Sequence, residues 1–475
     1  MRFNKRIATS GPAGGTPEGI EKLADLGANV CRLNFSHGSH ESHGKVIKMI
    51  KDINKKGKHS LGILLDVRGS GIRTGDVKEK INVKEGDLII FTPKITGKEK
   101  HITLELNYDK FAHDVKNADT IIIDNGAMEL DVVKIEGKNV IAKAREAGTI
   151  GSRRHVNIPG AYVSLPSFTD KDWEDIEFGI QQGVDFFATS FIRTAEDVKE
   201  VRDFIKKRKA DTQIIAKIET PQSVENIEAI VDASDGIMVA RGDLGCEIPF
   251  EDVPRVQNEI VRLCREKGKF VIVATHMLES MITNRAPTRA EVTDVAYASM
   301  IQADCTMLSG ETAGGMYPYK SLAAMAQILK ANETQVDPME SMLMSAECGE
   351  TTDMDERPRR EESLAASVLA YSLQAQAIIV ITKSGFTAKA VSNCRPLIPI
   401  YAFTDTESVQ RKLAPVWGVS AHTTELRDNP ETTVKNAIAM VRKLGGVKKG
   451  DRFVVISDIA TGDDRATTIQ IRVAA

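Results

Sequence analysis

Residues 186–245 read FFATSFIRTAEDVKEVRDFIKKRKADTQIIAKIETPQSVENIEAIVDASDGIMVARGDLG. Short apolar runs at 186–192, 214–219 and 236–240 alternate with amphipathic segments whose apolar residues recur at helical spacing. Apolar runs without polar alternation are typical of parallel strands that are buried on both faces. The stretch therefore predicts consecutive strand–helix units around a parallel sheet.

The same alternation extends in both directions along the chain. Counting every apolar run gives eight predicted strands, at 5–10, 30–35, 62–67, 186–192, 214–219, 236–240, 270–275 and 305–309. Helical patterns follow them at 17–26, 42–55, 169–182, 195–207, 223–233, 253–267, 288–302 and 318–332. Eight units predict a TIM (β/α)8 barrel. The alternative, an open doubly wound sheet, more often stops at about five to seven strands and carries a dinucleotide fingerprint after the first.

Two further regions interrupt and follow the barrel pattern. Residues 71–157 are rich in Val, Ile, Thr, Gly and Lys and predict a β-rich domain inserted after the third strand, at the catalytic face, where it could act as a lid. A polar segment at 347–362 predicts a surface linker, and the strand patterns beyond it predict a smaller C-terminal α/β domain. The predicted boundaries are 1–70 and 158–340 for the barrel, 71–157 for the insertion and 341–475 for the last domain.

Composition narrows the class of protein. Lys and Arg number 63 against 66 Asp and Glu, so the basic excess of nucleic-acid binders is missing. The sequence has neither an apolar run of about 18 residues nor a leader-like N-terminus, so we expect a cytoplasmic protein with no membrane or nucleic-acid partner. The six cysteines form no C-x-x-C pair and indicate reduced thiols. His37, His40 and His43 spread over about 120° of a helix, which favours a solvated helix start over a metal site.

Chemistry in a barrel enzyme is expected at the carboxyl ends of the strands, and these ends are polar here. The polar residues at or just after the predicted strands are Arg32, Asn34, Ser36, Asp66, Ser190, Arg193, Lys217, Glu219, Arg241, Asp243, Thr275, Ser309 and Glu311. Any one of them could simply cap a helix or face solvent, so the prediction rests on the set.

Lys217 and Glu219 are two residues apart on one strand, so their side chains share a face and project together into the barrel mouth. Glu219 and Asp243, from neighbouring strands, can share a hard divalent ion such as Mg²⁺ or Mn²⁺. Positive charge from Lys217 and Arg32 suits phosphoryl transfer, whose transition state spreads negative charge over phosphate oxygens. Gly242 lets backbone N–H groups approach an anion, either a phosphate or a carboxylate.

The chain resembles pyruvate kinase over essentially its full length. The motifs that carry the resemblance are TSGPA (9–13), CRLNFSHG (31–38), LD (65–66), IRTG (72–75), VNIPG (156–160), KIE (217–219), MVARGDLG (238–245), ATHMLESM (274–281), PTRAE (287–291) and MLSGETA (307–313). So many motifs in one order indicate common ancestry rather than coincidence.

The resemblance implies transfer of the phosphoryl group of phosphoenolpyruvate to ADP, followed by protonation of enolpyruvate to pyruvate. By matching position it implies the following roles: Lys217, Arg32 and Thr275 for catalysis; Arg32, Ser190, Ala240, Arg241, Gly242, Asp243 and Thr275 for substrate; Asn34, Arg73 and Arg154 for nucleotide; Glu219 and Asp243 for the divalent ion; and Asn34, Ser36, Asp66 and the Val67 carbonyl for a monovalent ion, K⁺. Thr275, relayed through water, is the expected proton donor, although an unperturbed hydroxyl is a weak acid.

Several positions depart from the family pattern. DVRGSGIR (66–73) stands where DTKGPEIR is common, and Gly71 replaces a Glu whose charge the family links to K⁺ dependence. In the insertion, residues 124–126 read DNG in place of two acids and Gly, and residues 153–155 read RRH in place of KKG. His276 replaces the usual Gln, which predicts at most a changed pH profile.

The C-terminal loop made of Thr382, Lys383, Ser384, Gly385, Phe386 and Thr387 is similar to the family's effector-binding loop. It predicts a phosphorylated effector held in an anion nest, and the alternative is a capped strand–helix turn. Two acids in the later loop, TGDDR (461–465), and Phe386 depart from that pattern.

Two other functions compete with an active kinase. The first is a catalytically weakened relative that binds phosphoenolpyruvate and regulates another process, suggested by Ser70, Gly71 and Asn125. The second is a barrel lyase or aldolase, which would leave the insertion and the last domain unexplained. The resemblance also implies a homotetramer.

Overall fold

The computed structural model describes residues 3–95, 101–115, 120–124, 126–347, 356–427, 429–461 and 464–474. Its centre is a closed barrel of parallel strands in the order β1-β16-β15-β14-β13-β12-β3-β2. The strands are β1 (Lys5–Thr9), β2 (Val30–Asn34), β3 (Gly62–Val67), β12 (Phe186–Thr189), β13 (Gln213–Ile218), β14 (Gly236–Ala240), β15 (Phe270–Ala274) and β16 (Cys305–Leu308). The predicted TIM barrel is therefore confirmed.

Helices surround this barrel. They are α1 (Pro17–Asp25), α2 (His40–Lys55), α4 (Asp170–Gln181), α5 (Ala195–Lys207), α6 (Pro221–Glu225), α7 (Ile227–Ala233), α9 (Val253–Glu266), α10 (Arg289–Met300) and α12 (Pro318–Asn332). Ser or Thr side chains accept from the first-turn N–H groups of six of them, at Thr16, Ser39, Thr169, Thr194, Thr220 and Thr288. These caps satisfy backbone donors that have no partner inside a helix, so they fix where each helix begins.

Two predictions about barrel elements are wrong in detail. The single helix expected at 223–233 is two, α6 and α7, because the chain leaves helical geometry at Asn226 between them. Several strands end earlier than predicted, so that Ser190, Glu219, Thr275 and Ser309 lie just past them. Phe191 and Thr275 adopt φ angles of 54° and 73°, and this left-handed backbone stops the ladder and redirects the chain into the barrel mouth.

The inserted region is β-rich, as predicted. It comprises β4 (Ile81–Val83), β5 (Leu88–Thr92), β6 (Ile102–Glu105), α3 (Phe111–Asp114), β7 (Thr120–Ile123), β8 (Met128–Glu136), β9 (Asn139–Ala144), β10 (Gly148–Ile150) and β11 (Val156–Asn157). A six-stranded sheet has the order β11-β7-β8-β9-β5-β6, and β10 pairs with β4. Alternate residues such as Ile89, Phe91, Val140 and Ala142 are fully buried in a core of its own. Asn125 lies outside the described residues.

The C-terminal region is an α/β domain. It contains α13 (Pro338–Glu347), α14 (Glu356–Ser372), β17 (Ala377–Ile381), α15 (Phe386–Asn393), β18 (Ile400–Thr404), α16 (Glu407–Lys412), β19 (Val419–Thr423), α17 (Pro430–Lys443), β20 (Arg452–Thr461) and β21 (Asp464–Val473), with sheet order β19-β18-β17-β20-β21. The predicted linker at 347–362 is shorter than expected, since α14 begins at Glu356; its Glu and Arg residues are good helix formers. Residues 348–355 of that linker lie outside the described part of the chain.

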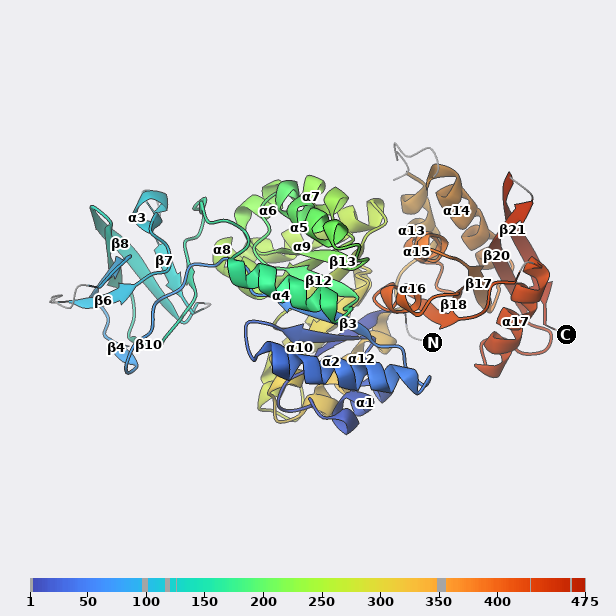
Figure 1. Ribbon diagram of the computed structural model, residues 1–475, viewed down its shortest axis with the longest axis horizontal. Coiled ribbons are helices and arrows are strands. Elements are labelled where there is room, and N and C mark those ends of the chain that lie inside the picture. The colour runs from blue at the N-terminus through green and yellow to red at the C-terminus, as the bar shows by residue number, and fades with distance from the viewer. Residues whose placement is uncertain are drawn as a thin grey trace.

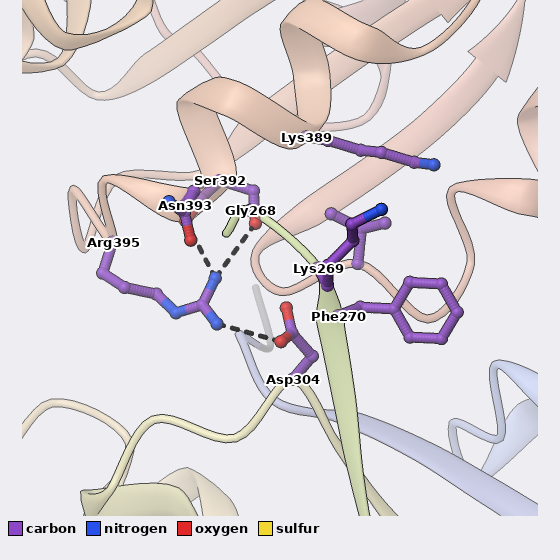
Figure 2. Close-up of a pocket in the computed structure, with 9 residues that line it drawn as sticks. Gly268, Lys269, Phe270, Asp304, Lys389, Ser392, Asn393 and Arg395 are labelled. Atoms are coloured by element: carbon purple, nitrogen blue, oxygen red, sulfur yellow. Dashed lines mark hydrogen bonds and ion pairs between the residues drawn. The ribbon is translucent and has the colours of Figure 1, made fainter. Parts of the chain in front are cut away.

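Figure 1 shows the inserted region at one end of the barrel and the C-terminal region at the other. Where the C-terminal region meets the barrel, Arg395 donates to Asp304, which precedes β16, over 3.0 Å (Figure 2). Lys5 at the start of β1 also donates to the Val419 carbonyl over 2.5 Å. The C-terminal region therefore covers the amino ends of the strands and leaves their carboxyl ends to the insertion. The exact boundaries at 70, 157 and 340 stay predictions.

Candidate active site

A buried charge cluster lies at the carboxyl ends of β2, β3 and β13. The Nζ atom of Lys217 is 2.8 Å from Oε1 of Glu219 and 3.4 Å from Oδ1 of Asp66, and it donates to Oγ of Ser190 over 2.7 Å. Arg32 Nε donates to the other oxygen of Asp66 over 2.7 Å. Lys217 and Glu219 thus project together, as the strand period predicts, and cations alternate with carboxylates across the mouth.

Burial and the charges within the cluster shift the pKa values of its members. Burial alone would lower the pKa of Lys217, but the charges of Asp66, Glu219 and Asp243 outweigh it and raise that pKa. Burial also acts to raise the pKa of Asp66, yet Lys217 and Arg32 hold it below its usual value. The pKa of Glu219 rises to about 7, chiefly through burial. A permanent ammonium therefore lies beside one carboxylate that is ionised and another that holds its charge weakly.

The two carboxylates predicted to hold a divalent ion face a common region. Asp243 lies in the short helix α8 (Arg241–Glu247), and its charge adds to the rise in the pKa of Glu219. Burial acts to raise the pKa of Asp243 itself, but contact with His155 and the charges of Lys217 and Arg73 lower it. In the described part of the chain, Glu219 Oε1 is buried with no aligned hydrogen bond. These two acids fit a Mg²⁺ or Mn²⁺ ion that takes its other oxygens from water and phosphate. Within the described residues, no group of three His, Cys, Asp or Glu side chains forms a metal cage.

The turn from β14 into α8 lies against the end of β15. A Cβ built at Gly242 would be 2.7 Å from Cγ2 of Thr275, so only glycine allows this approach. The Arg241 guanidinium is turned toward α10, where it pairs with Asp294 at 2.6 Å and donates to the Thr275 carbonyl over 2.7 Å. Arg241 thus holds Thr275 in its left-handed conformation. The part of α8 that faces Thr275 is the backbone of its first turn, which follows Ala240.

The predicted monovalent set is partly engaged within the protein. The Asn34 side chain accepts the Ser36 N–H over 3.1 Å, and the Val67 carbonyl accepts the Ser190 hydroxyl over 2.7 Å. Asp66 binds Arg32 and Lys217. These oxygens retain further lone pairs, which are the groups that a monovalent cation would bind.

Two of the predicted nucleotide residues lie on paired segments of the insertion, and the third belongs to the barrel. Arg73 and Arg154 belong to the two connecting segments of the insertion, whereas Asn34 ends β2. Arg154 pairs with Asp124 at 3.0 Å, and Arg73 donates to the Arg153 carbonyl over 3.2 Å. Burial, followed by the charge of Arg68, lowers the pKa of Arg73.

Sequence patterns missed several residues that organise the site. Phe191 donates its N–H to Glu219 over 2.8 Å, and Asn157 donates to Glu247 over 2.6 Å. Burial raises the pKa of Glu247 to about 8. Glu311, expected at the mouth, is 1% exposed and accepts the N–H groups of Leu278 and Ser309, so it orders two loops instead. Except for the bond between Ser309 and Glu311, these contacts join residues 28 or more positions apart, so they leave no local sequence signal.

The predicted effector loop precedes α15. Thr382 accepts the Gly385 N–H over 3.0 Å, and Gly385 has a φ of 84° that glycine adopts without strain. Arg359 of α14 lies 5.5 Å from the ring of Phe386. The loop is compatible with both an anion nest and a capped turn. Residues 462 and 463 of the later loop, and the side chains beside them, lie outside the described residues.

The fold and site together define a TIM-barrel enzyme whose charged mouth suits a phosphorylated substrate. The pyruvate kinase barrel domain model matches residues 1–322, and the pyruvate kinase alpha/beta domain model matches residues 363–472. The chain therefore belongs to the pyruvate kinase family, whose members are phosphotransferases.

Curated pyruvate kinases align with nearly the whole of this chain. The chain is 41% identical to plastidial pyruvate kinase 2 of Arabidopsis thaliana over 458 residues, 96% of this chain and 78% of the relative. It is 40% identical to the pyruvate kinase of Bacillus licheniformis over 474 residues, 99% of this chain and 80% of the relative. A crystal structure of a pyruvate kinase from Cryptosporidium parvum superposes with a TM-score of 0.93 at 33% identity, covering 100% of this chain and 96% of that one. In the part of this chain that the structure describes, no helix has the length and apolar character to cross a membrane.

Proposed function

We propose that this protein transfers the phosphoryl group of phosphoenolpyruvate to ADP, giving pyruvate and ATP. The observation that carries the proposal is the buried Lys217 ammonium, 2.8 Å from Glu219 at the mouth of a pyruvate kinase barrel. A phosphoryl group in transfer spreads negative charge over its equatorial oxygens. A fixed cation in a dry site stabilises that charge without reorganisation.

Lys217 and Arg32 supply this positive charge in the proposal. Arg32 is 8% exposed, and its pair with Asp66 holds the guanidinium in one orientation, from which it can bind a phosphate oxygen. Ser190 accepts from Lys217 and donates to Val67, so it orients the ammonium. Removal of water from the cluster strengthens each of these interactions.

Glu219 and Asp243 would hold the divalent ion. When bound, that ion supplies further positive charge to the phosphate oxygens. The backbone N–H groups of Gly242 and Asp243, together with the Thr275 hydroxyl, would bind the substrate carboxylate. After transfer, a proton must reach the methylene carbon of enolpyruvate, and Thr275 would deliver it through a water molecule.

Arg73, Arg154 and Asn34 would contact the nucleotide phosphates. For Arg154 this requires exchange of its pair with Asp124 for a phosphate, to which a guanidinium can donate two parallel hydrogen bonds. Asn34, Ser36, Asp66 and the Val67 carbonyl would hold K⁺, with Gly71 as the reason to test that requirement. The expected cytoplasmic location stays a prediction.

The decisive experiment measures pyruvate formation from phosphoenolpyruvate and ADP with Mg²⁺, in K⁺, in Na⁺ and in neither. We expect rapid turnover. A rate that rises with K⁺ supports the monovalent site, and an equal rate in every salt removes it while the kinase stands. No turnover in any salt, with phosphoenolpyruvate still bound, would replace the kinase by a substrate-binding relative.

Substitution of either carboxylate tests the divalent site. Glu219→Gln and Asp243→Asn should each raise the Mg²⁺ concentration for half-maximal rate by at least about tenfold, because each removes a charged oxygen ligand. Glu196→Gln on α5 is the matched control, since its side chain is 75% exposed and pairs with Lys199 of the same helix. An unchanged Mg²⁺ requirement in both site variants would move the ion elsewhere.

Gly242→Ala tests the substrate carboxylate pocket. The new methyl group must displace Thr275, so we expect the KM for phosphoenolpyruvate to rise by about tenfold, or about 1.4 kcal/mol. Gly245→Ala in the same helix is the control, because its Cβ meets only Val253 at 3.7 Å, an ordinary contact. Equal KM values for the two variants would contradict the assignment of Gly242.

We also propose a phosphorylated effector at Thr382, Lys383, Ser384, Gly385 and Thr387. A thermal-shift survey of sugar phosphates and nucleoside monophosphates tests it. Lys383→Ala should abolish any shift if the ligand binds at this loop. If no ligand shifts the melting temperature or changes the kinetics, the effector proposal is wrong and the loop is only a capped strand–helix turn. The homotetramer stays a proposal that light scattering in solution tests.

A further inference from the structure

His155 lies where the inserted domain joins the barrel. Two connecting segments run antiparallel there: Arg73 pairs with His155, and Val156 donates its N–H to the Ile72 carbonyl over 2.9 Å. The His155 carbonyl accepts the Asp124 N–H over 3.0 Å. The backbone of His155 is therefore held on both sides, which fixes the direction in which its side chain leaves the main chain.

The imidazole fills the space beside Gly71. A Cβ built at Gly71 would be 2.8 Å from Nε2 of His155 and 3.3 Å from the ring of Phe191. No L side chain could occupy position 71 without moving one of these rings. His155 is 7% exposed, so the imidazole is an integral part of the packing rather than a surface group.

From this position the imidazole reaches Asp243 and Phe191, and Phe191 binds Glu219. Nδ1 of His155 is 3.4 Å from Oδ1 of Asp243, within reach of an N–H···O contact. Its other side packs on Phe191, with ring centroids 5.3 Å apart. Phe191 in turn donates its backbone N–H to Glu219 over 2.8 Å. One side chain from the insertion thus touches Asp243 directly and Glu219 through a single residue.

We infer that His155 is a positioning residue that aligns Asp243 and Glu219 for the divalent ion, and that Gly71 is the small partner which lets the imidazole lie there. The inference rests on the proposed function for the role of the two carboxylates. Groups that orient metal ligands commonly change metal affinity by about 10–100-fold when they are removed. The insertion and the divalent site are therefore coupled through this ring.

The test measures Mn²⁺ binding to the full chain by the electron paramagnetic resonance signal of the free ion, without substrates or turnover. His155→Leu removes the donor and should weaken Mn²⁺ binding by about tenfold. His155→Asn keeps an N–H donor near the position of Nδ1 and should rescue most of the affinity. His113→Leu is the matched control, because that ring also belongs to the insertion but is 71% exposed.

Position 71 supplies a second, independent arm. Gly71→Ala should weaken Mn²⁺ binding because the methyl group displaces the imidazole. In the His155→Asn background, which lacks the Nε2 atom, the same substitution should cost far less, so the two changes are non-additive. Additive effects of the two substitutions would show that the methyl group at position 71 and the imidazole do not compete for this space, and would overturn the inference.

Melting temperature separates positioning from folding. We expect His155→Leu and the control to melt within a few degrees of the parent while only the first loses Mn²⁺ affinity. Unchanged Mn²⁺ affinity in His155→Leu, with pyruvate formed normally by the parent chain, would overturn this inference alone. A parent chain that binds Mn²⁺ in a His155-dependent way but makes no pyruvate would overturn only the proposed function.

Discussion

Lys217→Met should reduce the rate of pyruvate formation on the order of a thousandfold while phosphoenolpyruvate still binds. Loss of one preorganised positive donor to a transition state typically has an effect of this size. The Lys217 ammonium is held by Glu219, Asp66 and Ser190 in a buried cluster, so neither water nor a neighbouring flexible cation can replace it. The measurement is kcat at saturating substrates and Mg²⁺.

Folding must be measured alongside this rate. Removal of the ammonium leaves Asp66 and Glu219 less compensated, so some fall in the free energy of unfolding is expected. Glu219 limits that fall because its pKa of about 7 lets it take up a proton near neutral pH. Lys269→Met is the matched control, since Lys269 lies at the opposite end of the barrel and donates to the Ser234 carbonyl over 2.7 Å. A loss of rate that only follows the unfolded fraction would contradict a catalytic role.

Asp304→Ala should lower the free energy of unfolding by about 3–5 kcal/mol, the usual cost of breaking a buried ion pair. Asp304 accepts from Arg395 over 3.0 Å and from the N–H groups of Val271 and Trp417 over 3.1 Å each. The Arg395 side chain is 2% exposed, so the substitution strands a charge between the barrel and the C-terminal domain (Figure 2).

Trp417 is a local fluorescent probe of this seam, the contact between the barrel and the C-terminal domain around Asp304 and Arg395. Trp417 stacks on Phe3 with centroids 4.6 Å apart, and Trp173 is the second of only two tryptophans. Urea unfolding followed by Trp417 fluorescence in a Trp173→Phe background reports the seam directly. Asp304→Leu combined with Arg395→Met should recover part of the loss, because no unpaired charge remains, although the N–H groups of Val271 and Trp417 still lack their acceptor. A change below about 0.5 kcal/mol in Asp304→Ala would contradict the prediction.

The fold could be predicted well because its information is local. Buried parallel strands appear as continuous apolar runs, and amphipathic helices with Ser or Thr caps follow them. The strand over Gly62–Val67 was predicted at its observed bounds. Strand ends were less accurate, since the left-handed backbone at Phe191 and Thr275 depends on contacts such as Arg241 with the Thr275 carbonyl. The break at Asn226 was missed because both flanking segments keep helical periodicity.

Some of the site was predictable for the same reason. Lys217 and Glu219 are two residues apart, and strand geometry alone places them on one face. The proposed anion-binding role of the Gly242 backbone also rests on a local signal, a glycine just after a strand. The main chain of Arg241 was expected to serve the substrate, and that role stays a prediction. Its side chain pairs with Asp294, which is 53 residues later in the chain. No local pattern indicates that partner.

By itself the sequence determined the eight strands, the inserted and C-terminal regions, the motifs of the pyruvate kinase family and the shared face of Lys217 and Glu219 at the end of one strand. Only the tertiary structure decided which charges neutralise one another: Arg32 with Asp66, Arg395 with Asp304, and the approach of His155 to Asp243 beside Gly71. Periodicity records how a residue faces its own element. Burial and charge pairing depend on distances between residues that chain order leaves open, and only packing of the elements sets those distances.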